Sequence, residues 1–197
     1  MFRGILEYSG KKAGSNESNM NIAIRKYRES DAAEFQTAVL ESLETLEPWL
    51  AWASEAYSIE NAIEWALTAQ STWEEGSDYR FVIEDSDSDR MLGSVGINQV
   101  VPQHKIGNLG YWIRIGAQKQ GVCTLAARLA AAYAFDHLGF QRLEIHVPPD
   151  NVASIMVAGK LGGQYEGTFR NKLILNGRSV PASCYSIVPD DYNNPVD

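Results

Sequence analysis

The chain is poor in the residues that stabilise small secreted or metal-dependent folds. Its 197 residues include two cysteines, Cys123 and Cys184, and three histidines, and no Cys-x-x-Cys motif occurs. We therefore expect neither a disulfide framework nor a zinc site, and no metal at the functional site. So few cysteines also fit a reducing compartment, which predicts a cytoplasmic location.

Long apolar runs are also missing. No run approaches the roughly 18 apolar residues that a membrane-spanning helix needs. Residues 1–20 lack the continuous apolar segment of a secretory signal. We therefore expect no membrane partner and no export. Apolar residues still make up 45% of the chain, which is enough for one sizeable core.

Basic residues are outnumbered, with 17 Lys and Arg against 25 Asp and Glu and a net charge of -8. A nucleic-acid partner needs a basic surface, so none is expected. Acids are in turn missing from Arg90 to Phe135, where the average composition would supply about six. Two explanations stay open. Buried strands and an alanine-rich helix need few charges, and a site for a polyanion would exclude acids.

The hydrophobic pattern predicts one domain. Residues 1–20 are polar and aperiodic and are expected to form a flexible N-terminal extension, residues 21–190 the domain, and residues 191–197 a C-terminal tail. Helical spacing with start and stop signals predicts four helices, at 30–43, 59–75, 121–138 and 151–161. Alternation between turn signals predicts strands at 21–27, 79–84, 91–101, 106–115, 143–147, 164–175 and 180–188.

This order of elements predicts an α/β fold. The consecutive strands favour a mixed, mostly antiparallel sheet, and the helices would cover both of its faces in a three-layer α/β/α arrangement. The strand at 106–115, the helix at 121–138 and the strand at 143–147 form a β-α-β unit. These two strands should therefore be parallel neighbours.

The segment from Gly110 to Thr124 is the most informative for function. A strand ends there, and a helix begins with no acid in its first turns. The free N–H groups and the positive end of the helix dipole are thus available to an anion, and Gly121 allows close approach of a phosphate. A plain strand-to-helix turn is the competing interpretation. The motifs of P-loop nucleotide sites, dinucleotide-binding folds and α/β-hydrolases are all missing.

Two motifs in this order resemble one family. Gln118-Lys119-Gln120-Gly121-Val122-Cys123 is similar to the Q/R-x-x-G-x-G/A loop of the GNAT N-acetyltransferases. Asn151-Val152-Ala153-Ser154, followed by Ala158-Gly159-Lys160-Leu161-Gly162, is similar to the family's N-x-x-S helix and A-x-K-L-G sequence. Pro48-Trp49-Leu50 upstream resembles the RimJ/RimL branch, which acetylates ribosomal-protein N-termini. The resemblance covers about Ile22 to Val188.

The resemblance implies an acetyl-CoA-dependent N-acetyltransferase with the GNAT fold, whose parallel strands splay apart. Acetyl-CoA would be the cosubstrate, with its pantetheine arm in the splay against the backbone of Ile113, Arg114 and Ile115 and the side chain of Asn151. Ser154 would protonate the leaving thiolate as the catalytic residue. The pyrophosphate would be held by main-chain N–H groups of Gln118, Lys119, Gln120, Gly121, Val122, Cys123 and Thr124.

The acceptor implied by the resemblance is a primary amine, either a protein N-terminal α-amine or an amine of a small molecule. Trp49 and Trp52, on a Pro-broken segment, and Asn98, on a strand, are the candidate acceptor-binding residues. The acetyl group would move directly to the amine, because Cys123 has no basic partner that would make it a nucleophile. The family resemblance also allows a homodimer.

Two questions stay open. Relatives often carry an acid before the Asn-Gly turn, whereas residues 171–175 contain none, so a non-catalytic acyl-CoA-binding sensor of the same fold remains an alternative. Glu144 and His146 lie two residues apart on one strand face and could together act as a base. Structural polar groups satisfied by local hydrogen bonds are the favoured interpretation of this pair.

Overall fold

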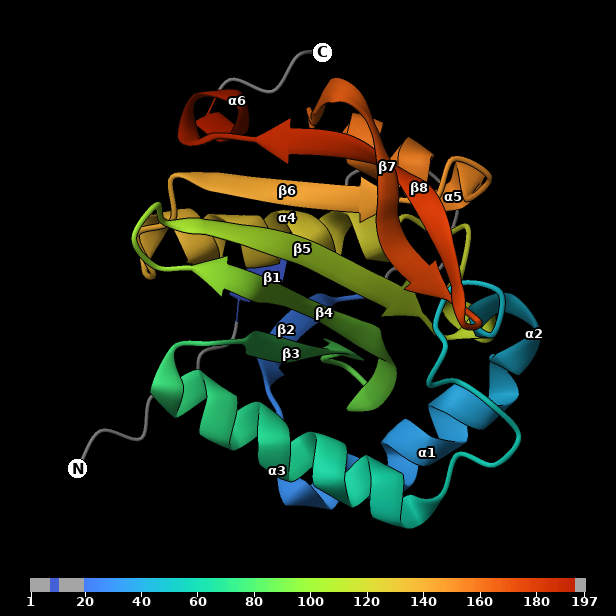
Figure 1. The fold of residues 1–197 in the computed structure, drawn as a ribbon. Coiled ribbons are helices and arrows are strands. Elements are labelled where there is room, and N and C mark those ends of the chain that lie inside the picture. The colour runs from blue at the N-terminus through green and yellow to red at the C-terminus, as the bar shows by residue number, and fades with distance from the viewer. Residues whose placement is uncertain (1–7, 11–19, 194–197) are drawn as a thin grey trace.

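Eight strands form one mixed sheet in the computed structural model, which describes residues 8–10 and 20–193 (Figure 1). Their spatial order is β1-β2-β3-β4-β5-β6-β8-β7, and β5 and β6 are the parallel pair among otherwise antiparallel neighbours. The strands are β1 (Tyr8–Gly10), β2 (Ile22–Lys26), β3 (Tyr79–Asp85), β4 (Arg90–Val101), β5 (Ile106–Ile113), β6 (Arg142–Val147), β7 (Gln164–Leu175) and β8 (Arg178–Ile187). The predicted mixed, mostly antiparallel sheet is confirmed.

Helices cover both faces of this sheet. Helices α4 (Val122–Asp136) and α5 (Val152–Lys160) pack on one face, and α1 (Ala32–Glu41) and α3 (Ile59–Glu75) pack on the other (Figure 1). The shorter helical segments are η1 (Glu29–Asp31), α2 (Leu43–Leu46), η2 (Ile115–Ala117) and α6 (Pro189–Asn193). The three-layer α/β/α arrangement is confirmed. Within the described ranges, no helix combines the length and the apolar character that a bilayer crossing requires.

The second predicted helix has the predicted ends, whereas the first does not. Helix α3 begins after Ser58, whose hydroxyl accepts the N–H of Asn61, and ends before Gly76 with φ 72°. The expected helix at 30–43 is divided into η1, α1 and α2. It breaks at Ser42, because this hydroxyl donates to the carbonyl of Ala38 at 2.6 Å and competes with the regular helical bonding.

The predicted N-terminal extension is described only in part. Tyr8–Gly10 pairs with β2 as strand β1, with Tyr8 opposite Ile24. The remainder of residues 1–19 lies outside the described residues. The predicted tail at 191–197 is described up to Asn193, where α6 ends. The domain boundaries themselves stay a prediction.

Helix α4 is seated on the sheet by small side chains. Five of its alanines are at most 2% exposed and belong to the main core cluster: Ala126, Ala127, Ala130, Ala131 and Ala134. Alanine lets a helix approach a sheet closely and has the highest helix propensity. The start of α4 is therefore held at a fixed position just beyond the end of β5.

The parallel strands β5 and β6 separate after a short paired stretch. Pairing is limited to Ile106, Gly107 and Asn108 of β5 against residues 142–144 of β6, and the strands then diverge (Figure 1). The side chain of Asn108 lies where they divide: its Nδ2 donates to Oδ1 of Asn98 at 2.9 Å, and its Oδ1 accepts the N–H of His146 at 3.4 Å. We call the gap beyond Asn108 the strand split, and it confirms the predicted splay.

A buried ion-pair network ties β2 to β3 and to the first helical turn. The Arg25 guanidinium donates to Asp31 at 2.8 and 2.9 Å and also to Glu84, and all three side chains are at most 10% exposed. Two buried carboxylates thus depend on a single cation.

Arg25→Met should therefore lower the free energy of unfolding by about 3 kcal/mol, since it leaves both carboxylates uncompensated. Urea unfolding followed by circular dichroism measures this loss. The exposed Arg178→Met in the β7–β8 hairpin is the control and should change the stability by less than about 0.5 kcal/mol. Equal effects of the two variants would contradict the prediction.

Candidate functional site

The start of α4 is open to an anion. Gly121 is the N-cap residue with φ 76°, and the first turn has neither an acid nor a side-chain cap from the described residues. Lys119, two residues earlier, also has a positive φ of 60°. Alternating left-handed and right-handed residues turn successive N–H groups toward one point and form an anion-binding concavity. The helix dipole adds positive potential at the same place.

Two glutamines of this loop brace it. Gln118 donates from Nε2 to Oγ1 of Thr45 at 3.0 Å and to the carbonyl of Ile113 at 3.2 Å. Gln120 donates from Nε2 to the carbonyl of Gly116 at 2.9 Å. These side chains hold the loop to α2 and to itself. They therefore fix the direction of the amides at the start of α4.

The backbone N–H groups just after β5, which the sequence assigned to pantetheine, form hydrogen bonds within the protein instead. The N–H of Arg114 donates to the carbonyl of Leu92 at 2.8 Å, and the N–H of Ile115 donates to the Ser42 hydroxyl at 3.0 Å. Both amides are thus engaged within the protein and cannot also pair with pantetheine. The part of β5 that faces the strand split is residues 109–113, of which Ile113 alone belongs to the predicted trio.

The start of α5 lies on the other side of the split. Asn151, 9% exposed, is the N-cap of this helix, and its Oδ1 accepts the N–H of Ser154 at 3.1 Å. Nδ2 of Asn151 has no hydrogen-bond acceptor among the residues that the structure describes. The Ser154 hydroxyl is half-buried and has no hydrogen-bond partner among residues 8–10 and 20–193.

Tyr111 joins the two sides of the split and was not singled out as a site residue by the sequence. Its hydroxyl donates to the carbonyl of Ser154 at 3.2 Å. The tie runs from β5 to α5, so it fixes Ser154 relative to the open edge of β5. Burial raises the pKa of the Tyr111 phenol, which keeps it a neutral donor.

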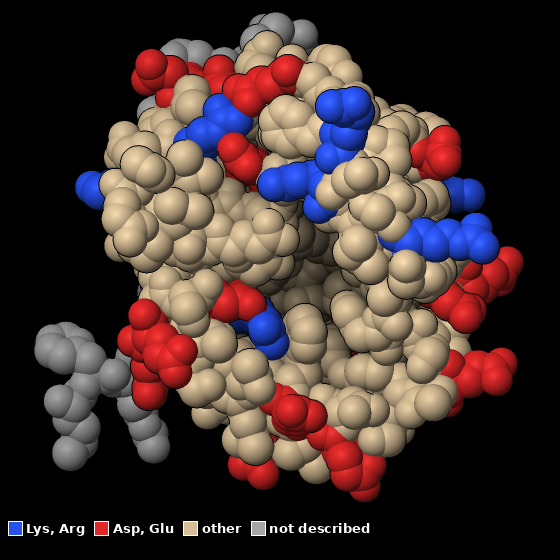
Figure 2. Space-filling view, in the orientation of Figure 1, with Lys and Arg blue, Asp and Glu red and all other residues tan. Residues whose placement is uncertain are grey.

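The opposite face of the sheet is hollowed. Figure 2 shows a depression between the β7–β8 hairpin and the helices α1 and α3. Asn98 lies on this face and accepts from Asn108. Trp52 packs into an aromatic cluster, with ring centroids 5.5 Å from Trp65 and 6.3 Å from Phe35, and Trp49 is half-buried nearby in the chain. Contact of Asn98, Trp49 or Trp52 with an acceptor stays a prediction.

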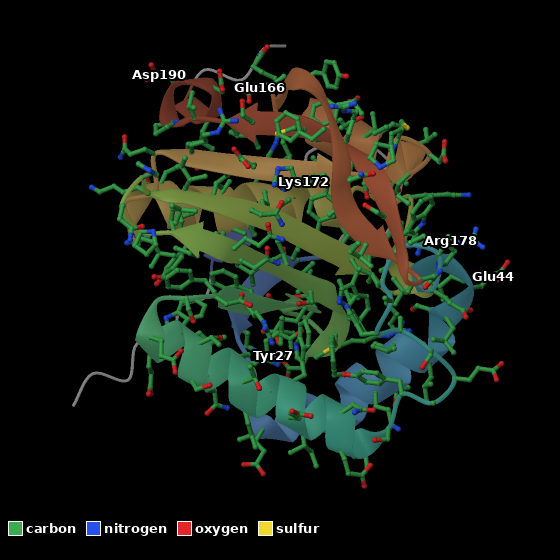
Figure 3. All side chains as sticks on the ribbon, viewed as in Figure 1. Tyr27, Glu44, Glu166, Lys172, Arg178 and Asp190 are labelled. Atoms are coloured by element: carbon green, nitrogen blue, oxygen red, sulfur yellow. The ribbon has the colours of Figure 1, made fainter. Side chains whose placement is uncertain are left out.

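The Glu144–His146 pair is not satisfied in the way the sequence favoured. Glu144 accepts from Nε of Arg142 at 3.0 Å, and its Oε2 lies 3.0 Å from Nε2 of His146, so the two side chains do contact each other. Neither ring nitrogen of His146 is aligned for a hydrogen bond with a described group, although the side chain is 3% exposed. Lys172 lies over β6 in the view of Figure 3. Burial, and then the charge of Lys172, lower the pKa of His146, so its imidazole is neutral at neutral pH.

Neither described cysteine is placed for nucleophilic attack. Cys123 and Cys184 are both free thiols. Burial raises the pKa of Cys123 to about 12. This agrees with the sequence argument that Cys123 does not form a covalent intermediate, since the thiolate is the reactive form.

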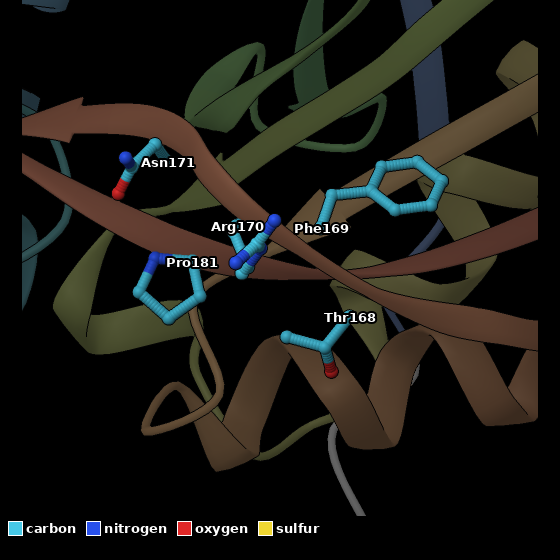
Figure 4. Close-up of a pocket in the computed structure, with 5 residues that line it drawn as sticks. All are labelled: Thr168, Phe169, Arg170, Asn171 and Pro181. Carbon is cyan, nitrogen blue, oxygen red and sulfur yellow. The ribbon is translucent and has the colours of Figure 1, made fainter.

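An open pocket of about 750 Å³ lies on the β7–β8 hairpin (Figure 4). Its lining consists of Thr168, Phe169, Arg170, Asn171 and Pro181. The pocket forms where the β7–β8 register shifts between Phe169 and Leu173, opposite Pro181, which has no N–H for the ladder. None of the residues predicted for the donor lines it, so the strand split remains the candidate site.

Comparisons with known proteins all find acetyltransferases. The family described as "Acetyltransferase (GNAT) domain" matches residues 21–164. The chain is 30% identical over 131 residues to the uncharacterized N-acetyltransferase YoaA of Bacillus subtilis (strain 168), which covers 66% of this chain and 74% of that protein. It is 32% identical over 103 residues to the spermidine N(1)-acetyltransferase of Escherichia coli (strain K12), covering 52% of this chain and 54% of that protein.

A solved structure shares the fold. Mycobacterium smegmatis RimJ, in complex with CoA-disulfide, superposes with a TM-score of 0.80 at 21% identity, covering 90% of this chain and 86% of that one. The similarity extends over most of the sheet and its helices, so the arrangement of strands around the split is a shared one.

The raised pKa of Cys123 predicts an inert thiol. At pH 8 we expect iodoacetamide to alkylate Cys123 on the order of a thousandfold more slowly in the folded protein than in urea, because a pKa of about 12 leaves almost no thiolate. Mass spectrometry of the peptide that contains Cys123 measures the rate. Equal rates in the folded and the unfolded chain would contradict this assignment.

Proposed function

Because the chain belongs to the GNAT acetyltransferase family, it is an acetyl-CoA-dependent N-acetyltransferase, and we propose that it moves the acetyl group directly to a primary amine of a protein N-terminus or a small molecule. The observation that carries this proposal is the uncapped start of α4 beside the strand split. In this proposal a linear donor would lie along the split and reach toward the hollowed face.

The residues at the split fit the donor. Amides from Lys119 to Thr124 would bind the diphosphate of acetyl-CoA, with the left-handed turn at Gly121 allowing close approach. The N–H of Gln118, which the sequence also assigned to the diphosphate, already donates to the carbonyl of Ile115 at 3.3 Å. The edge of β5 that faces the split, up to Ile113, and Nδ2 of Asn151 would bind the pantetheine arm. The carbonyl of Ile113 already accepts from Gln118, so the N–H of Ile113 is the group left for the donor. Arg114 and Ile115 would hold the end of β5 in place and would not bond to pantetheine through their amides, because these amides already bond within the protein.

Acetyl-CoA supplies an activated thioester, and the protein's part is mainly positioning. The amine nitrogen forms a bond to the thioester carbon, the carbon–sulfur bond breaks, and the amine loses its proton to solvent. Ser154 would give its hydroxyl proton to the departing thiolate and recover one from solvent. Asn151 and Tyr111 hold the backbone N–H and carbonyl of Ser154, and its hydroxyl has no partner within the described part of the chain, which supports this role.

The amine would enter from the hollowed face, with Asn98, Trp49 and Trp52 as its proposed contacts. This face lies opposite α4, so donor and acceptor would reach the split from different sides. Such an arrangement allows direct transfer within one complex, without a covalent enzyme intermediate.

The donor site is tested by Gly121→Asp. The new carboxylate would face the diphosphate, and φ of 76° disfavours any side chain, so we expect the Kd for acetyl-CoA to rise at least tenfold and thiol release to fall with it. Titration calorimetry gives the affinity. Thiol release with a panel of peptides, spermidine, amino acids and aminoglycosides gives the turnover.

Gly177→Asp is the matched control, because Gly177 also has a positive φ of 74° and open space around it in the β7–β8 turn. This control should keep the affinity for acetyl-CoA. Unchanged affinity in Gly121→Asp would refute the donor site. Wild-type protein that binds acetyl-CoA but releases no thiol with any acceptor would instead favour the sensor.

Ser154→Ala tests the proton donor. We expect kcat to fall about tenfold to a hundredfold with little change in the KM for acetyl-CoA, because the hydroxyl acts on the leaving thiolate and the Asn151 cap is kept. Ser71→Ala, an exposed change on α3, is the control and should alter neither constant. An equal loss in kcat and in donor affinity would indicate a structural role.

A further inference from the structure

Three side chains of different chemistry converge on the hollowed face of the sheet. Glu144 and His146 are two residues apart on β6 and therefore share a face. Cys184 of β8 is the cross-strand partner of His146, so its side chain projects from the same face. One ligand atom from each of the three residues lies within 4.8 Å of the other two.

The His146 imidazole is the anomaly in this cluster. The side chain is 3% exposed, yet neither ring nitrogen is aligned for a hydrogen bond with a described group. Its Nε2 nevertheless lies 3.0 Å from Oε2 of Glu144. Buried polar atoms are rarely left in this way. Two ligands of a single tetrahedral ion, with bonds of about 2.0 Å, lie about 3.3 Å apart and need no hydrogen-bond alignment.

We propose that Glu144, His146 and Cys184 form a binding site for one divalent cation of the zinc class. An imidazole, a thiolate and a carboxylate are the ligands that zinc and cobalt take, whereas magnesium and calcium require oxygen ligands throughout. The proposal revises the expectation, drawn from the few cysteines and histidines of the sequence, that the chain has no zinc site.

The surroundings orient the ligands. Nε of Arg142 donates to Oε1 of Glu144 at 3.0 Å, which leaves Oε2 toward His146. Arg142 is in turn held by Glu166, which also accepts from Ser186 at 2.7 Å. Partners of this kind fix a ligating carboxylate and raise the affinity of a metal site.

The charges near the cluster permit a dication. Glu144 and Glu166 supply two negative groups, which balance the two positive groups Arg142 and Lys172. Burial, and then the charges of Glu144 and Glu166, raise the pKa of the Cys184 thiol, so a bound cation would displace the thiol proton. With metal–ligand bonds of about 2.0 to 2.3 Å, the ligand atoms of a tetrahedral ion lie about 3.3 to 3.5 Å apart, so the three atoms, now within 4.8 Å of one another, would draw together on binding.

Cobalt provides the direct test, because its thiolate charge-transfer absorption reports a Co²⁺–sulfur bond. The full chain, purified with a chelator that is then removed, is titrated anaerobically with Co²⁺ alone and without acetyl-CoA. We expect one equivalent to bind with a thiolate-to-cobalt band, and one equivalent of Zn²⁺ to displace it. Because no donor is present, the result is independent of the proposed function.

Variants identify the ligands. Cys184→Ser should abolish the band, and His146→Gln should weaken Co²⁺ binding at least tenfold. Cys123→Ser removes the other described thiol and should leave the band unchanged. Circular dichroism checks that each variant is folded, and if one of the two ligand variants does not fold, the other decides. A wild-type titration without the band, or a band lost in Cys123→Ser but kept in Cys184→Ser, would overturn the proposal.

Discussion

The short pairing of two parallel strands is the constraint on which the site depends. β5 and β6 share three paired positions and then diverge at Asn108, whose amide side chain bonds to both sides of the division. Beyond that point, within the described ranges, β5 pairs with β4 alone and β6 pairs with β8 alone. Main-chain groups along the inner edges are therefore without a neighbouring strand among the described residues, and buried backbone groups of this kind need partners.

The elements around the split are held by contacts that differ in kind. Alanine packing sets α4 on the sheet, and the Asn151 cap and the Tyr111 hydroxyl set α5. On the opposite face, Arg114 at the end of β5 pairs with Glu34 at 2.9 Å and with Glu41 at 2.7 Å, both on α1. The loop that leads into α4 is thus anchored to both layers of helices.

Features set by neighbouring residues, such as helix ends, could be predicted from the sequence. Contacts between segments far apart in the chain could not. The Ser58 and Gly76 signals predicted both ends of α3, because caps act within one turn. The engaged amides of Arg114 and Ile115 were missed, since their acceptors lie on β4 and at Ser42. The Glu144–His146–Cys184 cluster was missed for a related reason: the β6–β8 register brings Cys184 opposite His146 from 38 positions away.

The acid-free stretch from Arg90 to Phe135 shows how two explanations can hold together. Burial accounts for much of β4, β5 and α4, where an unpaired carboxylate would be costly. Burial does not account for Ile115, Gly116, Lys119 and Gly121, which are exposed and still include no acid. The acids that Arg114 needs come from α1, on the other face of the sheet. Negative charge is therefore available where it stabilises the fold and missing from the exposed loop before α4, where it would repel a diphosphate.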